Sequence, residues 1–207
     1  AQHSLPDGTD LDAWLMTNGT SPALDVDMGL RRARAATMLL LALPGSTYLY
    51  QGEELGLLEV ADLKGEDLQD PIWLRDGMTR KGRDGCRVPL PWEPNGTSWG
   101  FGTGGAHLPQ PAWFADYAVS VERDDPSSTL SLYRAALALR KQLQSTEALT
   151  WVDSGPDVVH FVRDNGWHSI TNFSSESIAL PEGTVVLSSA DLIDGALPGY
   201  ATAWLTS

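Results

Sequence analysis

The chain reads LPGSTYLYQGEELG from residue 43 to residue 56, and this stretch carries the strongest signal for the fold. Pro44 and Gly45 end a helical segment, because proline cannot continue a helix and glycine favours the turn that follows one. Residues 47–50 are β-branched or aromatic, which is typical of a short buried strand. A helix that leads through a short turn into a buried strand is one step of an α/β repeat.

The segment before this stretch, residues 25–43, is predicted to be a helix. Asp25 and Asp27 stand near its N-terminus, where the helix dipole favours carboxylates. Residues 35–43 are apolar almost all round, so this half of the helix is expected to be packed on more than one side.

The segment after it, residues 51–126, has no long periodic pattern and is rich in glycine, proline and tryptophan. Loops of this length in compact domains are usually lids or binding loops. A second helix is predicted to begin at Ser127, Ser128 or Thr129, each a suitable N-cap, and to continue to Leu143 with one apolar stripe.

Beyond about residue 144 the pattern changes to short apolar runs separated by turns. We expect strands at residues 148–152, 158–162, 167–173, 177–180, 184–187 and 200–205. This spacing predicts a small antiparallel β-sandwich domain.

The composition restricts the partners and the compartment. A net charge of −13 would repel nucleic acid and anionic membranes, so neither is expected as a partner. No apolar run approaches the roughly 18 residues that a membrane span requires. The N-terminus has neither a signal peptide nor an initiator methionine, which is typical of a chain that starts within a longer protein. The single cysteine, Cys86, favours a cytoplasmic location.

A second motif, GRDGCRVPLPW, occupies residues 82–92. Its two arginines, Arg83 and Arg87, offer rigid forks of donors that suit carboxylates and vicinal hydroxyls. Gly82 and Gly85 permit tight turns, and the prolines stiffen the segment that follows. A stiff loop that presents arginine near aromatic rings suits sugar recognition. The alternative is a structural salt bridge to Asp84 or to a distant acid.

Glu53 and Glu54 are the obvious candidates for a catalytic carboxylate pair. A glycosidase needs two carboxyl groups about 5 to 9.5 Å apart across the scissile bond. Adjacent residues that leave a strand point to opposite faces, so these two are not expected to address one sugar. One of them is expected instead to fix the backbone or an arginine.

No cofactor or metal site is predicted. The histidines lack ligand spacing, and His160 and His168 are expected on the surface of the β domain. Cys86 has no histidine near it in the sequence and is expected to be a packed small residue. The chain contains no phosphate loop, no dinucleotide fingerprint and no nucleophile elbow.

The motifs together resemble bacterial α-glucosidases of glycoside hydrolase family 13, the α-amylase superfamily, including the oligo-1,6-glucosidases and maltases. The resemblance rests on RARAA from residue 32, YQGEELG from residue 50 and GRDGCRVPLPW from residue 82. It extends more weakly over the β domain.

The resemblance implies an α/β plus all-β fold, the C-terminal part of a (β/α)8 TIM barrel followed by an antiparallel β domain. Residues 1–144 would be the C-terminal portion of the catalytic barrel, and residues 145–207 the β domain. The two predicted helices would be the seventh and eighth of the barrel, residues 47–50 its eighth strand, and residues 51–126 the loop above that strand. Active sites of such barrels lie at the C-terminal ends of the strands.

The resemblance also implies a retaining mechanism with an aspartate nucleophile, a glutamate acid and base, and a stabilising aspartate after Asn-His. None of these motifs is present, so no catalytic residue is assigned to this chain. Arg87 matches the family arginine that contacts the nonreducing glucose. Gly52 and Glu53 match the motif of the eighth strand, and Arg83 and Asp84 are expected to organise the loop.

The expected partners are an α-glucoside oligosaccharide and the missing N-terminal half of the barrel. The intact enzyme would hydrolyse malto- or isomalto-oligosaccharides or sucrose, and this chain alone would be inactive. Two alternatives remain open, a noncatalytic binding or scaffold subunit and a family 13 glucosyl transferase or isomerase.

Overall fold

The computed structural model describes residues 2–207. The chain forms two compact units, and each unit combines two separate segments. Unit 1 contains the residues up to Gly29 together with Leu49–Ser131, and unit 2 contains Leu30–Tyr48 and Leu132–Ser207. The two units are defined by the contacts within each of them. They do not test a domain boundary near residue 144, which stays a prediction. Within the described residues, no helix has the length and apolar character needed to cross a bilayer.

The two predicted helices are present as α2, Val26–Ala42, and α5, Thr129–Leu143. The Ser128 hydroxyl accepts a hydrogen bond from the Ser131 amide at 3.1 Å, which satisfies one of the free donors at the start of α5. Arg140 near the end of α5 donates to backbone carbonyls at the end of α2, at 3.0 Å to Leu43 and 2.6 Å to Gly45. The helix stop at Pro44 and Gly45 is therefore held by side-chain donors.

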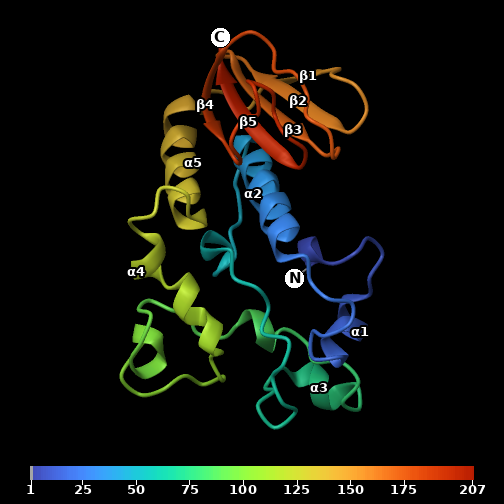
Figure 1. The fold of residues 1–207 in the computed structure, drawn as a ribbon, viewed down its shortest axis with the longest axis vertical. Helices are drawn as coiled ribbons and strands as arrows, with labels where there is room; N and C mark the ends of the chain where they lie inside the picture. The colour runs from blue at the N-terminus through green and yellow to red at the C-terminus, as the bar shows by residue number, and fades with distance from the viewer. Residues whose placement is uncertain (1) are drawn as a thin grey trace. The chain divides into compact units, whose positions relative to one another are not determined.

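Unit 2 contains one five-stranded antiparallel sheet (Figure 1). The strands are β1 Leu149–Val152, β2 Val158–Arg163, β3 Trp167–Asn172, β4 Thr184–Ser188 and β5 Ala201–Thr206. Their order is β1-β2-β3-β5-β4. The predicted sandwich is wrong in the described residues, because no second sheet faces the first. The predicted strand at 177–180 forms only an isolated bridge between Ile178 and Leu197.

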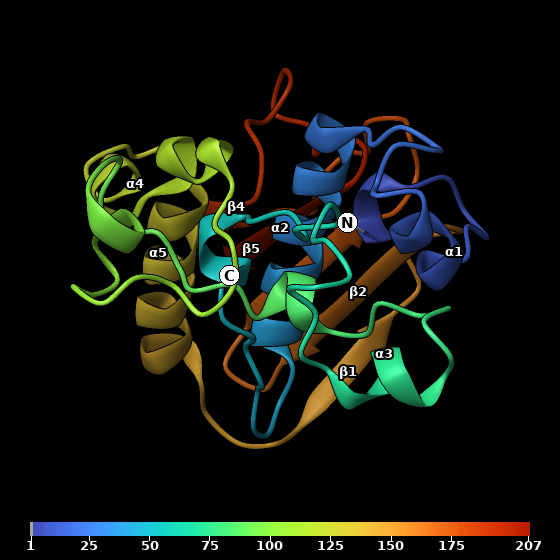
Figure 2. The same cartoon turned by 90° about the horizontal axis from the view of Figure 1, so that it is seen from below.

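The two faces of the sheet are covered by different elements. In unit 2, the helices α2 and α5 lie side by side on one face (Figures 1 and 2), where Thr37 and Tyr133 share a hydrogen bond of 2.8 Å. This core contains the buried side chains of Met38, Leu41, Ala42, Leu132, Ala136, Phe161, Trp167 and Trp204. The opposite face is covered by the segments around Ile178 and Leu192. Helices and loops thus replace the second sheet.

Unit 1 consists of loops and short helices around two small apolar clusters. Apart from the first residues of α2 and α5, its α-helices are α1 Leu11–Met16, α3 Pro71–Arg75 and α4 Val119–Glu122. The 3-10 helices are Gln2–Ser4, Glu53–Leu55, Asp84–Cys86, Thr97–Gly100 and Ala112–Tyr117. The prediction that residues 51–126 lack long regular elements is confirmed.

The predicted strand at residues 47–50 is not formed. This segment is irregular, and Tyr48 is 92% exposed. A β-strand requires hydrogen bonds to a neighbouring strand, and the described residues provide none beside this segment. The segment therefore has the composition of a strand but lacks the strand pairing that this composition favours.

Candidate functional site

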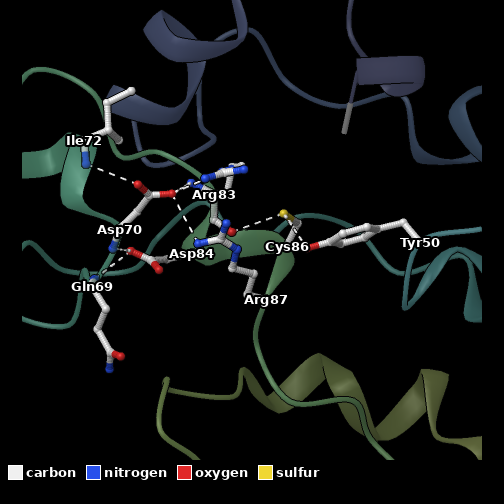
Figure 3. A network of polar contacts seen from close by, with 8 residues as sticks. All are labelled: Tyr50, Gln69, Asp70, Ile72, Arg83, Asp84, Cys86 and Arg87. Atoms are coloured by element: carbon white, nitrogen blue, oxygen red, sulfur yellow. Dashed lines mark hydrogen bonds and ion pairs between the residues drawn. The ribbon is translucent and has the colours of Figure 1, made fainter.

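The segment of residues 82–92, called the arginine loop below, is fixed in unit 1 by a buried aspartate. Asp84 begins the 3-10 helix Asp84–Cys86 and is 3% exposed. Its Oδ2 accepts hydrogen bonds from the backbone amides of Gln69 at 2.7 Å and Asp70 at 2.8 Å (Figure 3). Asp84 therefore ties the arginine loop to the residues that begin α3.

Asp70 is the anion that holds both arginines. Its Oδ1 accepts from the Ile72 amide at 3.1 Å, which caps α3. Its Oδ2 lies 3.3 Å from both Arg83 Nε and Arg87 Nη1 (Figure 3). The Ile72 amide, followed by the amide and guanidinium of Arg83, lowers the pKa of the Asp70 carboxyl. The salt-bridge partner of Arg83 is thus the distant acid Asp70 rather than Asp84.

The two guanidinium groups differ in how far they reach into solvent. The Arg83 side chain is 72% exposed, whereas that of Arg87 is 36% exposed. Arg87 also acts on Tyr50: burial and then Cys86 raise the pKa of the Tyr50 hydroxyl, and Arg87 partly offsets this rise. Arg87 is therefore the more enclosed of the two cations.

Cys86 links the arginine loop to the segment that precedes Gly52. Its Sγ lies 3.1 Å from the Arg83 carbonyl oxygen and 3.8 Å from the Tyr50 hydroxyl (Figure 3). The side chain is only partly buried, so the predicted packed position is not fully realised. The thiol lies between the loop and Tyr50, and its polar contacts are weak because a thiol is a weak hydrogen-bond donor.

The two glycines of the loop allow close approach of other elements. Gly82 has φ +75°, and a Cβ at this position would lie 2.6 Å from Ile72 Cγ2. A Cβ on Gly85 would lie 2.6 Å from the carbonyl oxygen of Val60. The Val60 amide in turn donates to the Gly85 carbonyl at 3.1 Å. These contacts leave no room for a side chain at either position.

Replacing Gly85 with alanine is expected to destabilise unit 1 by about 2 kcal/mol, because the methyl group would collide with backbone that cannot move freely. Urea unfolding followed by tryptophan fluorescence would measure the change. Gly102→Ala is the matched control, since no atom lies within 4 Å of the added methyl group. Equal effects of the two substitutions would contradict the close approach at Gly85.

The residue just before the arginine loop, Lys81, is a buried lysine that holds the start of the loop in place. Lys81 Nζ donates to Asn18 Oδ1 at 2.6 Å, to the Ala61 carbonyl at 2.7 Å and to the Leu63 carbonyl at 2.9 Å. Burial lowers the pKa of this ammonium group, and Asp62 partly offsets the effect. The cation joins the segment at Asn18 and the segment of residues 61–63 to the start of the arginine loop.

Glu53 and Glu54 have different environments. Glu54 Oε2 accepts from the Gly52 amide at 2.8 Å, so the expectation that one of them fixes the backbone is confirmed. Gly52 has φ +91°, which this tight turn requires. Glu53 is exposed and instead borders a pocket of about 150 Å³ beside the arginine loop. Glu59 borders the same pocket, and burial raises the pKa of its carboxyl.

Sequence reasoning missed Asp70 and Lys81 as members of this site. The signal for Asp70 was present, since aspartate before proline commonly caps a helix and its second oxygen remains available. Lys81 gave no local signal, because its acceptors lie far away in the sequence. In the part of the chain that the structure describes, no group of three or more metal-ligating side chains comes together. The arrangement can donate hydrogen bonds to a polar ligand.

The catalytic-domain model of α-amylase matches residues 19–148 of the chain. The match covers more than half of the chain and includes the whole arginine loop. The chain therefore belongs to the α-amylase family, glycoside hydrolase family 13. Within this family it is a partial chain with α-glucosidase-like sequence.

Individual relatives refine this assignment. A protein named "Probable alpha-glucosidase" from Rhizobium meliloti is 39% identical over 138 residues, which cover 65% of this chain and 24% of the relative. "Trehalose synthase/amylase TreS" from Mycobacterium tuberculosis is 33% identical over 164 residues, 69% of this chain and 24% of the relative. The chain thus spans about a quarter of the length of these curated relatives.

A solved structure supports the same family. The crystal structure of the "alpha-glucosyl transfer enzyme, XgtA" has a TM-score of 0.68 and 35% sequence identity to this chain. The superposition covers 93% of this chain and 38% of that enzyme. The similarity therefore extends over the five-stranded sheet as well as the region that matches the catalytic domain.

Proposed function

We propose that this chain is the C-terminal part of a retaining α-glucosidase that removes terminal α-linked glucose from oligosaccharides or sucrose. Residues 1–144 would complete the (β/α)8 barrel, and residues 145–207 would form the β domain behind it. The family assignment and the 39% identical relative named as a probable α-glucosidase support this proposal. The single cysteine supports a cytoplasmic location.

Arg87 is the residue that would bind the nonreducing glucose. The observation that carries this proposal is the shared anchor on Asp70, which fixes Arg87 Nη1 at 3.3 Å while leaving the side chain 36% exposed. A guanidinium group has five donors in a rigid plane, so one anchored nitrogen leaves others to meet vicinal hydroxyls. Gly52, Glu53, Arg83 and Asp84 would support this loop and the turn beside it.

The catalytic carboxylates would come from the N-terminal half of the barrel. Glu54 is engaged by the Gly52 amide, so Glu53 and Glu54 are not both available to act on one sugar. The segment 47–50, with its exposed Tyr48, has the composition of a strand that needs neighbours. Strands from the missing half would supply them.

The 207-residue chain alone is expected to show no hydrolysis of p-nitrophenyl α-glucoside, and addition of a separately produced N-terminal half is expected to restore it. The assay measures p-nitrophenol release, with the N-terminal half alone as the control. Binding of the two halves without activity would contradict the proposed function. Activity of the 207-residue chain alone would contradict the assignment of the catalytic acids to the other half.

Glucosyl transfer or isomerisation is the second candidate. It is favoured by the 33% identity to a protein named trehalose synthase/amylase and by the 35% identity to an α-glucosyl transfer enzyme. Product analysis of the reconstituted enzyme with sucrose, maltose and isomaltose would separate the candidates, because hydrolysis releases free glucose and transfer yields a new glycoside. A noncatalytic scaffold would instead lack the catalytic carboxylates throughout the parent gene.

A further inference from the structure

Two histidines form a hydrogen-bonded pair on the sheet of unit 2, on the face opposite α2 and α5. His160 on β2 places Nε2 3.0 Å from Nδ1 of His168 on β3. The other ring nitrogen of His160, Nδ1, lies 2.8 Å from the Ser154 hydroxyl oxygen. The sequence predicted surface positions for both, but His160 is only 5% exposed.

In the part of the chain that the structure describes, the pair has no charged partner. The strands β1, β2, β3 and β5 carry one other titratable side chain, Arg163, which faces α2 on the opposite side of the sheet. The turn that holds Ser154 carries Asp153 and Asp157, and the segments that cover this face carry Glu176, Glu182, Asp191, Asp194 and Tyr200. Within the described residues, none of these groups forms an ion pair or hydrogen bond with either imidazole.

This geometry requires that at least one of the two rings is neutral. A hydrogen bond between two imidazole nitrogens needs one N–H donor and one lone pair, and the bond to Ser154 is satisfied with either tautomer of His160. When both rings are protonated, both facing nitrogens are donors and the two charges repel each other. Burial lowers the pKa of both histidines, and the neighbouring ring lowers that of His160 further.

We propose that Ser154, His160 and His168 form an acid-sensitive latch that holds the turn of residues 153–157 against the sheet. The Ser154 bond fixes the middle of this turn to β2. The same turn accepts a hydrogen bond from the Phe173 amide through the Asp157 carbonyl at 2.7 Å, which connects it to the end of β3. Protonation of both rings would set two like charges against each other and displace His160 from its contact with Ser154, which would loosen the turn and the adjoining ends of two strands.

The direction of the pH effect follows from the lowered pKa values. In the unfolded chain the histidines bind protons near their ordinary pKa of 6.5, while the folded pair resists protonation. The stabilisation by the latch is fully present above that value and is lost as the pH falls through the lower folded pKa.

Imidazole titration of the full 207-residue chain by ¹⁵N NMR is the direct test. Both rings are expected to titrate below their ordinary value and as a coupled pair, and the Phe173 amide, which donates to the Asp157 carbonyl, is expected to lose protection against hydrogen exchange over the same pH range. Independent titration at or above the ordinary value would overturn the latch. This measurement needs no variant, so it does not depend on the folding of a mutant.

Two variants separate the latch from a merely structural pair. His168→Asn removes the second titrating ring and is expected to reduce the fall in the urea midpoint between about pH 7.5 and about pH 5, because only the buried His160 then resists protonation. Ser154→Ala is expected to weaken the protection of the Phe173 amide already at neutral pH. His107→Asn, in an exposed loop of unit 1, is the control and should leave the pH dependence unchanged. Unchanged protection of the Phe173 amide in Ser154→Ala would contradict the proposal.

Discussion

Replacing Arg87 with lysine in the reconstituted enzyme is expected to lower kcat/KM for an α-glucoside by about 100-fold or more. Lysine keeps the positive charge but loses the planar fork that Asp70 orients. A single flexible ammonium group can satisfy Asp70 or a glucose hydroxyl, yet it cannot hold a fixed geometry toward both. Steady-state kinetics with p-nitrophenyl α-glucoside would measure the change.

Arg83→Lys is the matched control, because it removes the other guanidinium group that Asp70 binds. Its side chain is twice as exposed as that of Arg87, and its contribution is expected to be limited to loop order. A loss of activity for Arg83→Lys as large as that for Arg87→Lys would assign both arginines a structural role. Urea midpoints of the two variants would show whether the loop itself had been disturbed.

The regular elements could largely be predicted from the sequence because their signals are local. The apolar residues from 35 to 43 and the stop at Pro44 and Gly45 define the end of α2, and the serines from 127 define the start of α5. The strands of the sheet follow from β-branched runs and turn residues in the same way. Such patterns act over a few residues and need no knowledge of distant partners.

The misses arise where a distant partner decides the structure. Residues 47–50 have strand composition but no strand beside them, so propensity alone does not produce β structure. Asp70 precedes the arginines it binds by 13 and 17 residues, and the turns that bring them together lie in an irregular loop. His160 lies in a correctly predicted strand, but its burial depends on the loops that cover the sheet. Local sequence does not contain this information.

Arg163 makes an extensive set of buried contacts in unit 2. Its guanidinium donates to the carbonyl oxygens of Ala148 and Ala42 at 3.0 Å each, and to that of Thr146. The side chain is 2% exposed and lies over the ring of Trp167 at 5.8 Å. One side chain thus joins the end of α2, the segment before β1, and β2.

Arg163→Met is expected to reduce the free energy of unfolding of unit 2 by about 3 to 4 kcal/mol. Methionine fills much of the same volume, so the loss reports chiefly on three carbonyl groups left without donors. Part of the loss is offset because a buried charge is also removed.

Lys141→Met, which removes an exposed cation from α5, is expected to change stability by no more than about 0.5 kcal/mol. Urea unfolding monitored by far-UV circular dichroism would measure both, and similar values for the two would refute a central role for Arg163. If Arg163→Met lowers the free energy of unfolding more than Lys141→Met does, the hydrogen bonds to these carbonyls join the helix end to the sheet, because the substitution nearly conserves apolar packing.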